Sequence, residues 1–250
     1  MSEKGLPAGT RPEGTQEETE AARAVRAMFS AIAPRYDLLN RLLSLRLDQS
    51  WRRRTARRLA PRLERAGSRA LDLCCGTADL ALELKRAGAS LVVGADFAHP
   101  MLVRAAAKAA AQRAPILLAE TDALRLPFAD NSFDVVAAAF GFRNLANYPQ
   151  GLREIHRVLK PGGEIGILEF ALPEKGFFAG LYRFYFRRLL PAIGRAVSGV
   201  RGPYSYLPAS VEKFPGCEEF NRWLEAAGFV AVSAERWTGG VVALHRGRKA

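Results

Sequence analysis

The sequence predicts an α/β protein: a doubly wound, mostly parallel sheet of seven strands with an antiparallel strand at one edge and a helical cap. Two observations lead to this prediction. From residue 69 onward, short apolar runs alternate with segments of about 10–15 residues at helical spacing, which is typical of parallel strands joined by crossover helices. Near the end of the chain, two apolar runs flank Gly239 and Gly240, which predicts a hairpin and therefore an antiparallel strand at the sheet edge.

The elements follow in order along the chain. Before the first strand the apolar residues have helical spacing only; Val25, Met28, Phe29 and Ile32 form one stripe, which ends at Pro34. The predicted strands are 70–74, 91–96, 116–120, 133–139, 164–170, 229–235 and 241–245. The predicted helices between them are 76–88, 99–113, 148–159 and 218–227, and a Pro-Gly-Gly turn is expected at 161–163.

This order of elements predicts one domain over 21–250 behind a polar tail, 1–20, that we expect to be disordered. Within the domain we distinguish a helical preface (21–67), a cofactor-binding core (68–171), a cap insertion (172–215) and a closing helix and hairpin (216–250). No repeat interrupts this division.

Composition excludes several classes of protein. A hydrophobic fraction of 49% with 25% charged residues excludes a disordered or collagen-like chain, and the three cysteines are too few for a disulfide framework. The cysteines and the three histidines lack zinc spacing, so we expect no metal, and free thiols fit a reducing cytoplasm. The net charge of +12 fits a membrane surface or an anionic substrate as well as it fits nucleic acid.

The turn after the first predicted strand points to a nucleoside cofactor. Gly76 allows close backbone approach, and the next strand ends at Asp96, 20 residues later, where a carboxylate can accept both ribose hydroxyls. The turn has a single glycine between Asp72 and Asp79, and these carboxylates would repel a diphosphate but suit a cationic sulfonium and an ammonium group. This favours S-adenosylmethionine over NAD, although Gly76 alone could be an ordinary turn residue.

Two further segments fit the same cofactor. Asp122 follows the third strand, where it can accept a hydrogen bond from the adenine amino group. Phe97 and Met101 come just after Asp96 and can cover the adenine face. Plain core packing explains Phe97 and Met101 equally well.

A specific family resemblance rests on several motifs together. They are LDLCCGTADL, DALRLPFADNSFDVV, FGFRNL, EIHRVLKPGGEIGILEF and GGVVALHRG, with FSAIAPRYDLLNRLLSL and YSYLPASVEKFP at either side. From about Val25 onward the chain resembles the ubiquinone/menaquinone biosynthesis C-methyltransferases, which are class I methyltransferases with a Rossmann-like fold. The first motif is shared by class I enzymes generally, whereas FGFRN with the YDLLN and YSYL segments is specific to this family.

The resemblance implies particular cofactor contacts. They fall on Thr77, Asp96, Asp122 with Ala123, and Ala139. At Ala139 the family often has a small polar residue, so only a backbone contact is expected there. Cys74 and Ala78 stand where class I enzymes usually have glycine; because both are small, we expect the turn to close.

The resemblance also implies methylation of a ring carbon on a prenylated hydroquinone, most often demethylmenaquinol, with a benzoquinol left open. A phenolate attacking the methyl group would need positioning and charge stabilisation. Arg143 follows the fourth strand and is our candidate for stabilising that charge, with Asn144 as a hydrogen-bond partner and second catalytic candidate. The candidates for lining the quinol pocket or relaying its proton are Tyr36, Asp37, Tyr204 and Tyr206.

A prenylated substrate implies contact with a membrane. In the cap insertion a predicted basic amphipathic helix carries Phe178, Leu181, Tyr182, Tyr185 and Leu189 on one face. Arginines interrupt its apolar run, so it does not read as a membrane span. We therefore expect a cytoplasmic enzyme that is peripheral on the inner face of a membrane and binds no nucleic acid. A methyltransferase of RNA or protein, or a non-enzymatic cofactor-binding scaffold, remains open, as does the oligomeric state.

Overall fold

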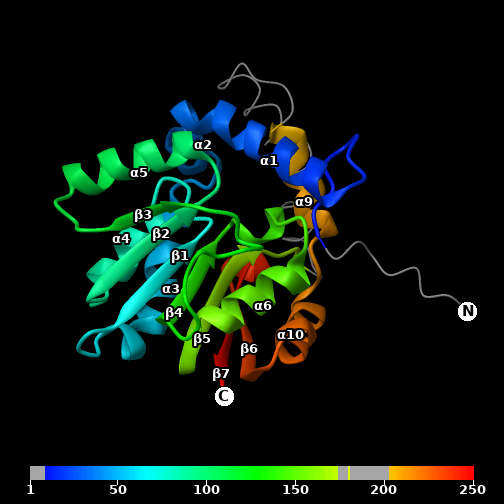
Figure 1. The fold of residues 1–250 in the computed structure, drawn as a ribbon. Coiled ribbons are helices and arrows are strands. Elements are labelled where there is room, and N and C mark those ends of the chain that lie inside the picture. The colour runs from blue at the N-terminus through cyan, green and yellow to red at the C-terminus, as the bar shows by residue number, and fades with distance from the viewer. Residues whose placement is uncertain (1–8, 174–179, 181–202) are drawn as a thin grey trace, which may run out of the picture.

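Seven strands form one sheet in the order β3-β2-β1-β4-β5-β7-β6 (Figure 1). The computed structural model describes residues 9–173, 180 and 203–250. The strands are β1 (Arg69–Leu73), β2 (Leu91–Asp96), β3 (Leu117–Glu120), β4 (Phe133–Ala139), β5 (Leu159–Phe170), β6 (Phe229–Trp237) and β7 (Val242–Lys249). The first five strands are parallel to one another, and β7 runs antiparallel to both β5 and β6.

The predicted doubly wound sheet with an antiparallel edge hairpin is confirmed. Within the hairpin, β7 lies between β5 and β6, and β6 is outermost. Burial accounts for this arrangement: the first four residues of β7 are buried, whereas most of β6 is exposed or half-buried. Strand order reverses at β1, so a crevice is expected at the carboxyl ends of β1 and its neighbour β4.

Helices cover both faces of the sheet (Figure 1). One face packs against α3 (Leu47–Leu63), α4 (Asp79–Arg86) and α5 (His99–Ala111), and the other against α6 (Tyr148–Val158) and α10 (Cys217–Ala226). Strand β1 shows the alternation that makes this possible: Leu71 and Leu73 join the core beneath α6 and α10, while Ala70 joins the core beneath α3 and α4.

The part of the helical preface before α3 lies across the carboxyl ends of the strands. It comprises α1 (Glu18–Ile32), the 3₁₀ turn η1 (Ala33–Arg35) and α2 (Tyr36–Leu43), and α1 contacts both α5 and α9 (Pro203–Lys213) (Figure 1). Pro34 falls in η1, so the predicted end of the first helical stripe is confirmed. The preface therefore covers the crevice that the strand order creates.

Two sequence predictions differ from the structure. Disorder does not extend to Glu20, because Thr10 is buried, its amide donates to the carbonyl of Leu145 (2.8 Å), and α1 already begins at Glu18. The Pro-Gly-Gly segment at 161–163 lies within β5 rather than separating two elements. The strand absorbs it as a bulge, since pairing with β4 jumps from Leu159 to Glu164.

The cap insertion is described only in part. The helix predicted around Phe178, Leu181, Tyr182, Tyr185 and Leu189 lies outside the described residues. Among the helices that are described, none combines the length and apolarity needed to cross a bilayer.

Candidate functional site

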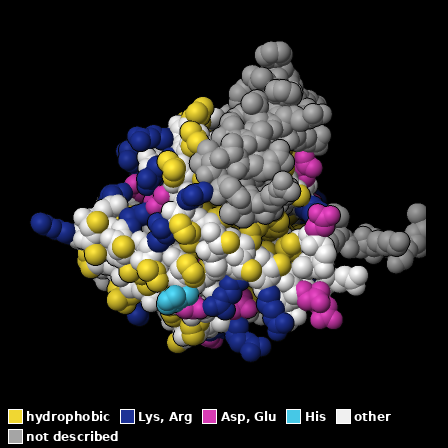
Figure 2. Space-filling model, turned by 90° about the horizontal axis from the view of Figure 1, so that it is seen from above, with side chains coloured by type: hydrophobic (Ala, Val, Ile, Leu, Met, Phe, Trp, Pro, Cys, Tyr) yellow, Lys and Arg dark blue, Asp and Glu magenta, His cyan; other side chains and the backbone are white. Residues whose placement is uncertain are grey.

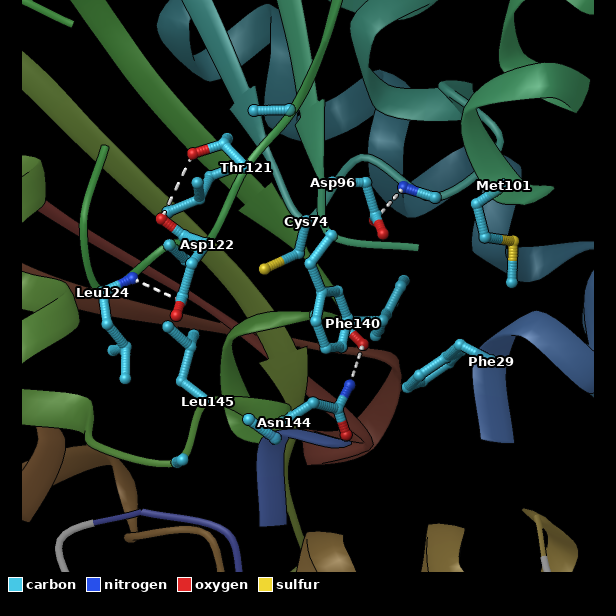
Figure 3. A pocket seen from close by; sticks show the side chains of 18 of the residues that line it. Phe29, Cys74, Asp96, Met101, Thr121, Asp122, Leu124, Phe140, Asn144 and Leu145 are labelled. Atoms are coloured by element: carbon cyan, nitrogen blue, oxygen red, sulfur yellow. Dashed lines mark hydrogen bonds between the residues drawn. The ribbon is translucent and has the colours of Figure 1, made fainter. Parts of the chain in front are cut away.

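A cavity of about 740 Å³, counted with its open mouth, lies at the carboxyl ends of β1, β2 and β4 beneath α1 and α2 (Figure 3). Its walls are largely apolar with a few polar groups, which is typical of cofactor sites. The lining residues are Ala22, Phe29, Tyr36, Leu73, Cys74, Gly76, Ala95, Asp96, Phe97, Met101, Thr121, Asp122, Ala123, Leu124, Phe140, Gly141, Asn144, Leu145 and Ala146.

The turn between β1 and α4 forms the floor of this cavity. Its backbone is left-handed at three positions: Cys74 (φ 56°), Gly76 (φ 54°) and Ala78 (φ 68°). Only the glycine takes this conformation without a steric penalty, which is on the order of 1–2 kcal/mol for each of the other two. The turn closes as predicted, with backbone strain at two of the positions where class I enzymes usually have glycine.

Asp72 anchors α4 instead of facing the cavity. Ala78 has no side-chain cap to offer the helix, and the buried Asp72 carboxylate accepts the amide hydrogen of Ala81 (2.8 Å), which the first turn leaves without a partner. The other carboxylate oxygen, Oδ1, has no hydrogen-bond partner among the described residues. Burial raises the pKa of Asp72 to about 8. This aspartate positions the turn and is not one of the lining residues.

Asp96 does reach the cavity, at the end of β2. Its Oδ2 accepts from the Gly76 amide (2.8 Å) and its Oδ1 from the Ala98 amide (2.9 Å), so the carboxylate is fixed between strand end and turn. The residue is only 7% exposed, and burial raises its pKa. Each oxygen retains a second lone pair, so the carboxylate can still accept from a diol.

The opposite wall comes from the segment after β3. In Figure 3, Thr121, Asp122 and Leu124 lie on one side of the cavity and Asp96 and Met101 on the other. The Asp122 side chain accepts the amide hydrogen of Leu124 (2.9 Å) through Oδ1, which holds the carboxylate at the rim. A flat aromatic group between these walls would meet apolar side chains on its faces and a carboxylate at its edge.

The FGF segment, 140–142, follows β4 and closes the cavity next to the turn that forms its floor. Gly141 lies so close to the turn that a Cβ there would come within 2.4 Å of the Cys74 Cβ, so only glycine fits. Phe140 and Gly141 line the cavity, whereas Ala139, the predicted fourth cofactor contact, does not. Ala139 is half-buried and packs against core clusters on the sheet. Burial raises the pKa of the Cys74 thiol well above its usual value, so this cysteine is not a nucleophile at neutral pH.

The sequence analysis predicted that Arg143 would offer its charge to the substrate. The structure contradicts this, because Arg143 is not free at the mouth of the site. It lies in the 3₁₀ turn η2 (Phe142–Asn144), is 6% exposed, and pairs with the buried Glu169 of β5 (2.8 Å). The second Glu169 oxygen accepts the Arg143 amide hydrogen (3.0 Å), so one carboxylate clamps both the side chain and the backbone of this turn. Arg143 Nε has no partner among the described residues. The pair carries no net charge, and Arg143 is not a lining residue.

The substrate candidates fall into two groups. Tyr36 and Asn144 line the cavity, and the Tyr36 ring lies over Gly76, 3.6 Å from where a Cβ would be. Burial raises the pKa of Tyr36, so its hydroxyl stays protonated. Tyr206 lies outside the lining and donates to Asn144 Oδ1 (3.0 Å), and its hydroxyl also contacts that of Thr10 (2.9 Å). The side chain of Tyr204 lies outside the described residues.

Asp37 and Thr77 form a polar cluster beside the turn, away from the lining. Lys108 of α5 contacts Asp37 (2.6 Å), Asp79 (2.7 Å) and the Thr77 hydroxyl (2.8 Å), and that hydroxyl donates to Asp37 (2.6 Å). Burial works to raise the pKa of Asp37, but the hydrogen bonds from Lys108 and Thr77 outweigh it and hold the pKa below its usual value. The cluster ties α2 to α4 and α5, and Lys108 offsets the negative charge of the acid after the turn.

The cavity thus brings together some of the predicted residues and not others. Those that line it are Tyr36, Gly76, Asp96, Phe97, Met101, Asp122, Ala123 and Asn144; those that lie behind or beside it are Asp37, Asp72, Thr77, Ala139, Arg143 and Tyr206. Sequence reasoning missed Glu169 and Lys108, which act on the site through other residues, and it did not assign Phe29 to the lining. The apolar helical stripe that contains Phe29 could have indicated this, because such a stripe packs against another part of the protein or lines a pocket.

Within the described residues no group of three or more His, Cys, Asp and Glu side chains could hold a metal ion. Comparison with known proteins points instead to one family. The profile of the ubiE/COQ5 methyltransferase family matches residues 15–249. Demethylmenaquinone methyltransferase from Thermus thermophilus is 55% identical over 221 residues, which is 88% of this chain and 99% of that protein.

Other relatives agree. Demethylmenaquinone methyltransferase from Deinococcus radiodurans is 50% identical over 85% of this chain and 88% of that protein. Ubiquinone/menaquinone biosynthesis C-methyltransferase UbiE from Geobacter sulfurreducens is 42% identical over 92% of this chain and 90% of that protein. Among solved structures, a SAM-dependent methyltransferase from Thermotoga maritima aligns with a TM-score of 0.60 at 17% identity, covering 90% of this chain and all of that one. This last likeness shows the fold.

Proposed function

The chain belongs to the ubiE/COQ5 methyltransferase family, and we propose that it transfers a methyl group from S-adenosylmethionine to a ring carbon of a prenylated hydroquinone in quinone biosynthesis. The observation that carries this proposal is the Asp96 carboxylate, fixed at the strand end by two amides and facing a mostly apolar cavity. Bound there, S-adenosylmethionine supplies an electrophilic methyl group on a cationic sulfur.

The lining fits such a cofactor on its nucleoside side. Asp96 can accept the two ribose hydroxyls, and Asp122 can accept from the adenine amino group, with its orientation set by the Leu124 amide. Phe97 and Met101 lie on the same side as Asp96 and can cover one face of the base. The buried Asp72, with its unpartnered Oδ1 and raised pKa, adds no full negative charge beneath the turn at neutral pH.

We assign the contacts with the quinol to Tyr36 and Asn144. Tyr36 remains protonated, so its hydroxyl can donate a hydrogen bond to a ring oxygen as negative charge develops there. Asn144 is held from behind by Tyr206 and so presents a fixed amide to the cavity. Arg143 supports this arrangement as a positioning residue: its pair with Glu169 fixes the turn that carries Asn144.

The naphthoquinol head group, as in demethylmenaquinol, has the stronger support. The relatives at 55% and 50% identity are named demethylmenaquinone methyltransferases. The relatives at 41–43% that are named ubiquinone/menaquinone biosynthesis C-methyltransferases keep the benzoquinol as the second candidate. A methylation assay with both quinols side by side distinguishes them.

The test of the proposal is Asp96→Asn with Glu120→Gln as its matched control. Glu120 ends the neighbouring strand and does not line the cavity. Losing a charged acceptor for a ribose hydroxyl costs about 1.5–3 kcal/mol, so we expect roughly 10- to 100-fold weaker S-adenosylmethionine binding in Asp96→Asn and little change in the control. Calorimetry measures the affinities, and mass spectrometry of the quinol measures methyl transfer. Clean binding of NAD to the wild type, without binding of S-adenosylmethionine or its demethylated product, would contradict the proposal.

A further inference from the structure

Exposed leucines gather around one bend of the chain. Among the described residues eight large hydrophobic side chains are exposed, and four of them fall within ten consecutive positions. These four are Leu38 (60% exposed), Leu42 (45%), Leu45 (79%) and Leu47 (41%), and we call them the leucine surface. Single exposed leucines need no explanation, whereas four within one short stretch of a folded protein are the kind of group that forms an interaction site.

The local backbone holds this surface outward. Leu38 and Leu42 are four residues apart and share one face of α2, while Leu39 packs inward and is 3% exposed. Two consecutive non-glycine residues, Leu45 (φ 52°) and Arg46 (φ 64°), then adopt the left-handed conformation. This strained bend presents the most exposed leucine of the group at its tip, and such strain is often retained for function.

Within residues 35–48 the exposed charged side chains are all basic. Arg35 and Arg46 are exposed beside it, and Arg41 is half-buried. The two carboxylates of the same stretch point inward: Asp37 contacts Lys108 (2.6 Å) and the buried Asp48 contacts Arg52 (2.6 Å). An apolar surface bordered by arginines, with its acids turned inward, is complementary to an anionic lipid bilayer.

The leucine surface adjoins the cavity. Tyr36, the first residue of α2, lines the cavity, and Leu42 lies six residues further along the helix, about 9 Å along its axis. Figure 2 looks down onto this end of the molecule and shows hydrophobic and basic side chains, with some acidic ones among them, on the part that the grey atoms leave uncovered. A bilayer seated here would lie at the side of the cavity that α2 forms.

We propose that the leucine surface docks the protein on the surface of an anionic bilayer, with the leucines entering the headgroup region and the arginines contacting lipid phosphates. The inference rests on the proposed function, because a prenylated quinol resides in the bilayer. A second copy of the chain is a poorer occupant: four leucine side chains expose on the order of a few hundred Å², well below the ~800 Å² per partner of a stable dimer.

The test uses the full chain and vesicles of phosphatidylglycerol and phosphatidylcholine in equal parts, with flotation as the readout. The variant is Leu42→Ser with Leu45→Asn, since asparagine tolerates the left-handed backbone. Its control is Leu117→Ser with Val230→Ser, because these residues are exposed by 57% and 42% on β3 and β6 at the two edges of the sheet. We expect binding to fall at least about tenfold in the variant and to remain unchanged in the control.

A second variant, Arg46→Asn, removes charge without touching a leucine. It should weaken binding to the anionic vesicles about fivefold and leave the weak binding to pure phosphatidylcholine unchanged. Thermal unfolding and S-adenosylmethionine binding verify that each variant is folded. Turnover of a short-tailed, water-soluble quinol without vesicles should stay at the wild-type level in all of them.

The outcomes separate the inference from the proposed function. Flotation of the leucine and Arg46 variants at the wild-type level overturns the inference, as does light scattering that shows a wild-type dimer and a monomeric leucine variant. Wild-type protein that floats but methylates neither quinol overturns the proposed function and leaves the docking surface standing.

Discussion

Asp72 shows how the fold sets the chemistry of a single residue. It lies on β1, is 1% exposed, and bonds to the Ala81 amide, while its other oxygen has no partner among the described residues. Burial raises its pKa from 3.8 to about 8, so between these values the folded chain keeps a proton that the unfolded chain releases. Because the folded state then binds more protons, stability falls as pH rises from about 4 to about 8 and is level above that.

Replacing Asp72 by Asn should remove this pH dependence. Asparagine cannot ionise, and its oxygen can still accept from the Ala81 amide. Each pH unit is worth ~1.4 kcal/mol, so we expect the variant to match the wild type near pH 5 and to exceed it by a few kcal/mol near pH 8. Urea unfolding at both pH values measures this. The control is Asp130→Asn, a change at an exposed carboxylate. Its difference in unfolding free energy from the wild type should be the same at both pH values. A variant less stable than wild type at pH 8 would show that Asp72 is ionised in the folded protein.

At this scale the sequence could predict residues that follow strand ends. Asp96, Asp122 and Gly76 were predicted because each lies at or just after the end of a strand, and the carboxyl ends of parallel strands meet at one edge of the sheet. The environment of Arg143 could not be predicted, because its partner Glu169 is 26 residues away on β5, and no local pattern reports which buried charges meet. The Arg143 guanidinium, which was predicted to stabilise charge on the reacting ring, is instead paired with the Glu169 carboxylate.

At the scale of elements, the Lys108 cluster holds the helical preface over the core. Lys108 on α5 meets Asp37 on α2 and Asp79 on α4, while Thr77 bonds to both Lys108 and Asp37. The pKa of Asp37 is lowered, so its contribution to stability is present at neutral pH and is lost only as pH falls through its folded value. Because Tyr36 directly precedes Asp37 in the chain, the cluster also keeps Tyr36 above Gly76.

Lys108→Met should loosen α2 without unfolding the sheet. It leaves the half-buried Asp37 without its cation, which costs about 1–3 kcal/mol. We expect faster amide hydrogen exchange in α2, unchanged exchange in α6, and several-fold weaker S-adenosylmethionine binding as Tyr36 becomes less well placed. Arg104→Met, at an exposed position of the same helix, is the control. Unchanged exchange in α2 would show that packing alone holds the preface.

Most strands and helices were predicted to within a few residues because their apolar periodicity is local. The exception among the helices is α9 (Pro203–Lys213), where an irregular segment was expected. The bulge at 161–163 was missed, since a Pro-Gly-Gly segment looks the same in a turn and in a bulged strand until its partner strand is known. The contact between α2 and α5 depends on charges 71 residues apart, Asp37 and Lys108, which periodicity does not report.

Across the whole molecule, the N-terminal segment meets a late helix at the rim of the cavity. The Thr10 amide donates to Leu145, the Arg11 guanidinium to the carbonyl of Ala146 (2.7 Å), and the Thr10 hydroxyl contacts that of Tyr206, 196 residues away. Leu145 and Ala146 line the cavity. A polar composition predicted disorder here, but hydrogen bonds to the carbonyls of the rim fix residues 9–11, and composition does not report such partners.

Deleting residues 1–16 should therefore affect the quinol side of the site more than the cofactor side. The deletion keeps Glu17 and the start of α1 but removes three hydrogen bonds, worth roughly 0.5–1.5 kcal/mol each, from the segment that carries Asn144 and from Tyr206. We expect a several-fold higher KM for the quinol with S-adenosylmethionine affinity nearly unchanged, because Asp96 and Asp122 lie on other elements. Deleting only residues 1–8 is the matched control and should leave both constants near wild type. Equal losses in quinol KM and cofactor affinity would show instead that the segment stabilises the whole preface and does not act on the rim.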